Sequence, residues 1–177
     1  MTENRPHPRR LGHVVLNVRD LAASVRFYTE IVGLEVSDYI EDQMAFLRCS
    51  TDHHDLALAQ IPREDPRYAD CYVPARPGLE HFSYEMGSLA EIEAAARFLQ
   101  QHGVEIVRGI GKHGPGENLF LVFKDPDGNY VEFYADMVQV TAERPYTPRV
   151  WPNDLDAFDQ WHFDRFLVRP PEWGPKP

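Results

Sequence analysis

In the first third of the chain, apolar residues recur in some segments at every second position and in another at helical spacing. Residues 11–18, LGHVVLNV, alternate between two sides with a period of two, which predicts a β-strand. Residues 20–32 place apolar side chains on one stripe at helical spacing, with Asp20 as a helix cap and Gly33 as the end. Three more short apolar runs bounded by polar turns predict strands at residues 33–40, 43–49 and 55–60. The order is therefore β-α-β-β-β.

The second half of the chain repeats this order. Residues 79–86 predict a strand, and residues 88–102 predict an amphipathic helix that Ser88 caps and Gly103 ends. Three further strands are expected at residues 104–109, 118–124 and 129–135. Two halves with the same order of elements predict an α+β fold built from two paired βαβββ modules.

Short matching segments indicate that the repeat is a duplication. LGH at 11–13 recurs as LEH at 79–81, and GLE at 33–35 recurs as GVE at 103–105. Neither half can bury its helix and sheet alone, so we expect one domain over residues 9–137. Its parts are module one at 9–61, a Pro-rich linker at 62–78 and module two at 79–137.

A Pro-rich and Trp-rich tail follows at residues 138–177. Within it, residues 153–167 predict a helix. Large aromatic side chains, Trp151, Trp161 and Trp173, favour packing over disorder. The tail is expected to cover an opening in its own domain, to pack on another subunit, or to act only as a strap over hydrophobic surface.

Composition narrows the possible partners. The 28 acidic residues outnumber the 18 basic ones and give a net charge of −10, which argues against nucleic acid and against anionic membrane surfaces. No apolar run is long enough for a signal peptide or a bilayer span. Cys49 and Cys71 fit no metal or redox spacing and are expected to be free thiols in a reducing compartment. We therefore expect a cytoplasmic protein that binds a small molecule.

The duplication also suggests a metal site. It places His13 opposite His81 on the first strands, and aligning residues 55–59 with 130–134 places Ala57 opposite Glu132 on the last strands. Two imidazoles and one carboxylate suit divalent first-row metals and leave coordination positions for substrate and oxygen. The alternative is that these polar residues lie on the solvated face of an antiparallel sheet. The repeat favours the metal site, because it makes the two histidines equivalent without reference to chemistry.

Residues 11–136 resemble the vicinal oxygen chelate superfamily, in which paired βαβββ modules form a β-cup around a metal. Within them, GKHGPGENLFLVFKDPDGNYVE at 111–132 is similar to the signature of type I extradiol ring-cleavage dioxygenases. The stretch HHDLAL at 53–58 resembles the family segment that carries a second-sphere histidine. The matching signature positions are Gly111, His113, Leu121, Asp125, Pro126, Gly128 and Glu132.

The resemblance implies Fe(II), or Mn(II), held by His13, His81 and Glu132, with a catechol-type aromatic substrate and O2 as reactants. It implies catalytic roles for two further histidines. His113 would exchange a proton with the substrate, since an imidazole titrates near neutral pH, and His54 would hydrogen bond to bound oxygen or substrate.

The family signature also concerns the substrate-binding residues, which are expected to be Phe120, Val122 and Tyr130. Val122 stands where the family has a tyrosine that contacts the substrate hydroxyl. Either Tyr130 or a tail residue such as Tyr146 supplies the missing hydroxyl group, or the substrate or reaction differs from that of the family. Many enzymes of this type carry two such domains and this chain carries one, so assembly into a homo-oligomer, a dimer or larger, is expected.

Two other functions stay open. A glyoxalase-type metal-dependent isomerase or epimerase would need a fourth protein ligand from the first half, and Gln60 is the nearby candidate. Ala57 at the fourth position favours the dioxygenase. A non-enzymatic small-molecule-binding protein of the same fold would be expected to lack the metal set altogether.

Overall fold

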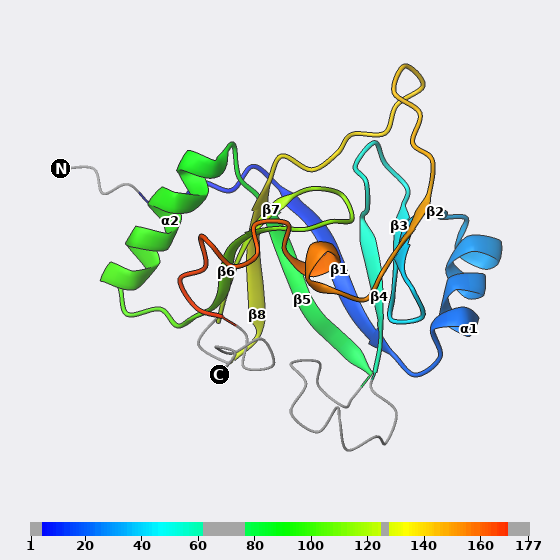
Figure 1. The fold of residues 1–177 in the computed structure, drawn as a ribbon, viewed down its shortest axis with the longest axis horizontal. Helices are drawn as coiled ribbons and strands as arrows, with labels where there is room; N and C mark the ends of the chain where they lie inside the picture. The colour runs from blue at the N-terminus through cyan, green and yellow to red at the C-terminus, as the bar shows by residue number, and fades with distance from the viewer. Residues whose placement is uncertain (1–4, 62–76, 125–127, 170–177) are drawn as a thin grey trace.

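The computed structural model describes residues 5–61, 77–124 and 128–169, and its central feature is one nine-stranded sheet (Figure 1). The strand order is β6-β7-β8-β5-β1-β4-β3-β2-β9. The first module contains β1 (Leu11–Val18), α1 (Leu21–Arg26), η1 (Phe27–Val32), β2 (Glu35–Ile40), β3 (Met44–Arg48) and β4 (Leu56–Gln60). The second contains β5 (Gly78–Glu85), α2 (Leu89–Gln101), β6 (Ile106–Lys112), β7 (Leu119–Lys124) and β8 (Tyr130–Ala135).

The two modules have the same topology. In each, the first strand pairs in parallel with the last, and the other two strands follow outward as antiparallel neighbours. Strands β1 and β5 pair antiparallel and join the modules into one sheet. The predicted α+β fold of paired βαβββ modules is therefore confirmed.

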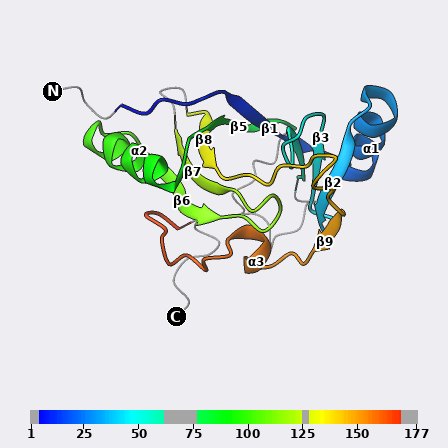
Figure 2. The ribbon, with the colours of Figure 1, turned by 90° about the horizontal axis from the view of Figure 1, so that it is seen from above.

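Helices α1 and α2 lie at the two outer ends of the sheet (Figures 1 and 2). Asp20 caps α1 by accepting a 2.8 Å hydrogen bond from Ala23 N, and Ser88 caps α2 by accepting from Glu91 N. The first helix is not α-helical throughout, because its second half winds as the π-helix η1 before ending at Gly33. Each helix packs on the outer face of its own module, which leaves the inner face of the sheet for a site.

The C-terminal segment crosses the open side of the curved sheet (Figure 2). Strand β9 (Arg149–Trp151) adds to the edge of β2, and α3 (Leu155–Phe158) follows it. The expected helix over residues 153–167 is wrong beyond Phe158. Asp159 ends it, because its buried carboxylate accepts the backbone N–H groups of Lys112, Trp161 and Phe163 instead of continuing the helix.

Some predictions fall outside the described residues. These predictions concern residues 62–76 of the linker, residues 125–127 of the turn, Cys71 and Trp173. Cys49 is described and is an exposed free thiol. Across the described part of the chain, no helix is long and apolar enough to cross a membrane.

Candidate metal centre

The sheet register places the three candidate ligands at one point on its inner face. Val15 pairs with Ala57 in the first module, and Ser83 pairs with Glu132 in the second. The sequence repeat aligns the same residues, Val15 with Ser83 and Ala57 with Glu132. The structural alignment therefore agrees with the sequence alignment, and Ala57 occupies the place in module one that Glu132 occupies in module two.

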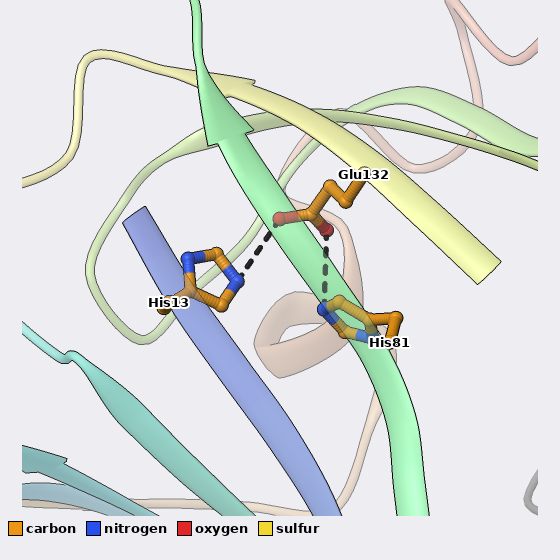
Figure 3. Close-up of side chains that lie close together, drawn as sticks. All are labelled: His13, His81 and Glu132. Atoms are coloured by element: carbon orange, nitrogen blue, oxygen red, sulfur yellow. Dashed lines mark ion pairs between the residues drawn. The ribbon is translucent and has the colours of Figure 1, made fainter. Parts of the chain in front are cut away.

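His13, His81 and Glu132 converge from β1, β5 and β8 (Figure 3). His13 Nε2 lies 3.1 Å from Glu132 Oε1, and His81 Nε2 lies 3.7 Å from Glu132 Oε2. One ligand atom from each residue lies within 4.8 Å of the others. All three side chains are buried, so the alternative of a solvated sheet face is wrong: the polar side of these strands faces the interior of the cup.

The polar atoms of this cluster fit a divalent metal. His81 Nε2 and both Glu132 carboxylate oxygens are buried without a well-aligned hydrogen bond among the described residues. Burial alone would raise the pKa of Glu132, but His113, His13 and His81 lower it well below its usual value. An ionised carboxylate beside two imidazole rings is a donor set that Fe(II) and Mn(II) accept.

Glu80 is a neighbour of this cluster that no sequence pattern indicated. A register shift in the β1–β5 pairing falls between the pairs Val15–His81 and Leu16–Leu79, so Glu80 and His81 are both buried and both reach the cavity. His81 Nδ1 contacts the Glu80 carboxylate, which in turn lies 3.9 Å from Arg108. Although burial lowers the pKa of His81, the carboxylates of Glu80 and Glu132 raise it. The contact orients His81 with Nε2 toward Glu132.

The cluster lies in the wall of a cavity of about 240 Å³. Most of the remaining wall is apolar and comes from module one. The tail adds the polar residues Asn153 and Asp154 to the wall, and β6 adds Arg108. The apolar wall consists of Val15, Ile40, Met44, Phe46, Ala57 and Ala59, with Ala157 and Phe158 from the tail.

His113 stands in this wall and is held on two sides. Its ring stacks on Phe120 at 3.9 Å, and its Nδ1 donates to the Phe158 carbonyl at 2.8 Å. A carbonyl only accepts, so the proton is on Nδ1 and Nε2 is left facing Glu132 Oε2, 3.9 Å away. The Gly-rich loop behind it is tied to the tail, since Gly114 N donates to the Ala157 carbonyl. A side chain at Gly114 would collide with Trp151 and with the Asp156 carbonyl.

His54 also lines the cavity and is buried against His13, with the two ring centroids 4.6 Å apart. His53 beside it is fully buried, so the pair is not the solvated one that the sequence allowed. Burial and the neighbouring His13 and His53 lower the pKa of His54 well below its usual value.

Residues 10–133 match the family model described as the glyoxalase/bleomycin resistance protein/dioxygenase superfamily. The chain belongs to this superfamily. Among its relatives, a metapyrocatechase 2 of Cupriavidus necator is 28% identical over 95% of this chain and 45% of its own length. A catechol-2,3-dioxygenase of Bacillus subtilis is 32% identical over 76% of this chain and 44% of its own length. The chain thus spans about half the length of these superfamily members.

Two solved structures have the same fold. A Mn(II)-bound glyoxalase from Novosphingobium aromaticivorans superposes over the whole chain, and over 53% of its own length, with a TM-score of 0.80 and 28% identity. A homoprotocatechuate 2,3-dioxygenase from Brevibacterium fuscum superposes over 88% of this chain, and 42% of its own length, with a TM-score of 0.72. At 22% identity the second likeness concerns the fold alone.

The cavity lining does not include Phe120, Val122 or Tyr130, the residues expected to contact substrate. Phe120 supports the ring of His113, and Val122 is fully buried opposite Glu132 in the β7–β8 pairing. Tyr146, a suggested replacement for the tyrosine of the extradiol dioxygenase signature, hydrogen bonds to Asp38. Phe120 and Val122 therefore contact site residues without lining the cavity.

Gln60 does not supply a fourth metal ligand. Its side-chain oxygen accepts from Leu21 N, and its amide nitrogen donates to the Arg19 carbonyl at 2.8 Å, so the side chain holds the connection between β1 and α1. Gln43 is a polar residue of module one that does line the cavity, and its amide nitrogen donates to Asp42. Among the described residues, the fourth position in the repeat is Ala57, which carries no ligand atom.

Proposed function

We propose that the chain is a non-haem Fe(II)-dependent extradiol dioxygenase that cleaves a catechol-type aromatic ring with O2. One observation carries the proposal: the buried His13, His81 and Glu132 set has Ala57 at the fourth position and opens onto a cavity with an apolar wall. A three-ligand site leaves positions for a chelating diol and for oxygen. Relatives named as catechol and biphenyl-diol dioxygenases support the same reaction.

Bound iron would supply Lewis acidity toward the diol and redox chemistry with dioxygen. The apolar wall around Phe46, Ala57 and Ala59 would receive the ring and exclude water. His54 and His113, both in the cavity lining, would move protons between the substrate hydroxyls and the product. The Phe158 carbonyl accepts a hydrogen bond from His113 Nδ1 and so holds the ring with Nε2 toward Glu132.

The proposal includes Mn(II) as an alternative metal, a cytoplasmic location and assembly into a homo-oligomer. The first follows from the donor set, which accepts either ion. Assembly into a homo-oligomer is checked by size-exclusion chromatography with light scattering. Detection of a monomer alone would count against this assembly.

The test begins with anaerobic purification and metal analysis. Oxygen uptake and the appearance of a yellow ring-opened product are then followed with a panel of catechols that carry apolar, charged or no ring substituents. Uptake with release of the coloured product supports the proposal. Bound metal without uptake on any member of the panel contradicts it.

Glu132→Gln tests the ligand set. The amide loses the negative charge that holds the ion, so metal retention and oxygen uptake should both be lost. Glu85→Gln on β5 is the matched control, because Glu85 pairs with Arg10 and does not line the cavity. Unchanged metal retention in Glu132→Gln would refute the ligand assignment.

A glyoxalase-type isomerase is the second candidate, favoured by the 28% identical Mn(II)-bound glyoxalase structure. It would act on a metal-bound carbonyl compound without consuming oxygen. Metal-dependent isomerisation of a hemithioacetal without oxygen uptake on catechols would favour this candidate over the dioxygenase.

A further inference from the structure

A second buried cluster lies behind the cavity and centres on Asp38 of β2, whose side chain is fully buried. Three donors from the tail reach its carboxylate: Tyr146 Oη at 2.7 Å, Arg149 N at 2.7 Å and Trp151 Nε1 at 2.8 Å. Burial alone would raise the pKa of Asp38, but His53 and these donors lower it. Asp38 is therefore an ionised acceptor, fixed in place by the tail.

His53 connects this carboxylate to the cavity. Its Nε2 lies 3.2 Å from Asp38 Oδ2, and its Nδ1 lies 3.1 Å from Nδ1 of His54. The Nε2 atom makes no well-aligned hydrogen bond within the described residues, and the Asp38 carboxylate is the acceptor within reach. The three side chains thus form a line from the tail to the cavity wall.

The close approach of His53 depends on a glycine. Gly116 has φ +74°, and a Cβ there would lie 3.0 Å from His53 Nδ1, the atom that contacts His54. The fully buried ring of His53 is also held edge-on by Tyr146, with centroids 4.9 Å apart. The ring is therefore confined in the orientation that directs one nitrogen to Asp38 and the other to His54.

The order of these contacts sets the position of each proton. A carboxylate only accepts, so the proton of a neutral His53 belongs on Nε2, and its Nδ1 carries the lone pair. The facing Nδ1 of His54 must then donate. A neutral imidazole has one N–H, so Nε2 of His54 is left unprotonated as the ring nitrogen available to the cavity.

We propose that Asp38 and His53 are positioning residues that hold His54 in the Nδ1–H tautomer, with Nε2 as a hydrogen-bond acceptor toward the bound diol. The tautomer is a property of the folded chain. The role toward the diol rests on the proposed function. In this tautomer His54 presents a lone pair at Nε2, so it accepts a hydrogen bond from the diol and has no proton there to donate.

The tautomer can be measured directly in the metal-free, full-length chain. Two-bond ¹H–¹⁵N correlation spectra separate protonated from unprotonated ring nitrogens, and loss of signals in single histidine variants assigns them. The expected result is a proton on Nδ1 of His54 and on Nε2 of His53. A proton on Nε2 of His54 in the wild type would overturn the proposal without any need for a variant.

His53→Phe removes the acceptor while keeping a ring of similar shape. The His54 proton should then shift toward Nε2, and kcat of the Fe(II)-loaded enzyme should fall about 10- to 100-fold with a smaller change in KM. His102→Phe, at the exposed end of α2, should change neither measurement. An unchanged His54 tautomer in His53→Phe would refute the proposal.

The two proposals fail in different ways. The expected tautomers in a chain that cleaves no catechol would sink the proposed function and leave the positioning by Asp38 and His53 standing. Ring cleavage by a wild-type chain whose His54 carries its proton on Nε2 would support the proposed function and refute the positioning by Asp38 and His53.

Discussion

The hydrogen bond between Trp151 and Asp38 offers a quantitative test of how the tail is held. Trp151→Phe keeps an aromatic ring in the same place and deletes the 2.8 Å bond from Nε1 to the carboxylate. A hydrogen bond to a buried charged group contributes about 1.5–3 kcal/mol to the free energy of unfolding. Asp38 keeps its other two tail donors, so we expect a loss of about 2 kcal/mol, in the lower part of this range.

Thermal unfolding of the metal-free protein measures this loss. For a chain of this length about 2 kcal/mol corresponds to a fall in Tm of about 4–8 °C. Trp161→Phe is a close control, because Arg165 lies 4.8 Å over the Trp161 ring just as Arg149 lies 4.9 Å over that of Trp151. The cation–π contribution is therefore similar in both variants, and the difference between them isolates the bond to Asp38.

Both variants are compared by differential scanning calorimetry at neutral pH, and the fold of each is checked by near-ultraviolet circular dichroism. Equal Tm values for the two variants would refute the reasoning, since the Asp38 bond would then add nothing to the docking of the tail. A fall well beyond this range in Trp151→Phe would mean that the ring itself, and not its N–H group, holds the tail in place.

Three further predictions concern the metal centre and its support. Ala57→Glu should add a fourth ligand, so metal retention should rise while oxygen uptake on catechols is lost; retained uptake would contradict the equivalence of Ala57 and Glu132. Stripping the metal with a chelator should lower Tm, and restoring it at about 100 times its Kd should recover about 2.7 kcal/mol, because the ion binds only the folded chain. Asp38→Asn should be less stable than the wild type at neutral pH, and the difference should shrink as the pH falls. The folded-state pKa of Asp38 lies below its ordinary 3.8, so its contribution is complete above that value and is lost as the pH falls through the folded-state pKa. Urea unfolding between pH 3 and 7 checks this, and a constant difference would argue against an ionised Asp38.

The duplication made the clustering of the three candidate ligands predictable. Local periodicity gave the strands, and the matching segments gave the register, which together bring His13, His81 and Glu132 to one point. The same logic identified Ala57 as the fourth position. These predictions work because strand pairing has a period of two, so a repeat fixes which side chains share a face.

The supporting residues escaped prediction for identifiable reasons. Glu80 follows from a register shift in β5, which breaks the strict alternation that a strand pattern assumes. Asp38 meets partners that lie far along the chain in the tail, and no local pattern marks such a contact. The helix expected over residues 153–167 failed because Asp159 binds distant and local backbone N–H groups, which outweigh the helical periodicity.

The position of the tail donors along the chain has a consequence for synthesis. The last of the three proposed metal ligands, Glu132, is made before the first of the tail donors, Tyr146. A nascent chain therefore carries every atom of the metal cradle before Asp38 meets the residues that fix it. We therefore expect the proposed metal ligands and the proposed support of His54 to form at separate stages, the second only after the tail has left the ribosome.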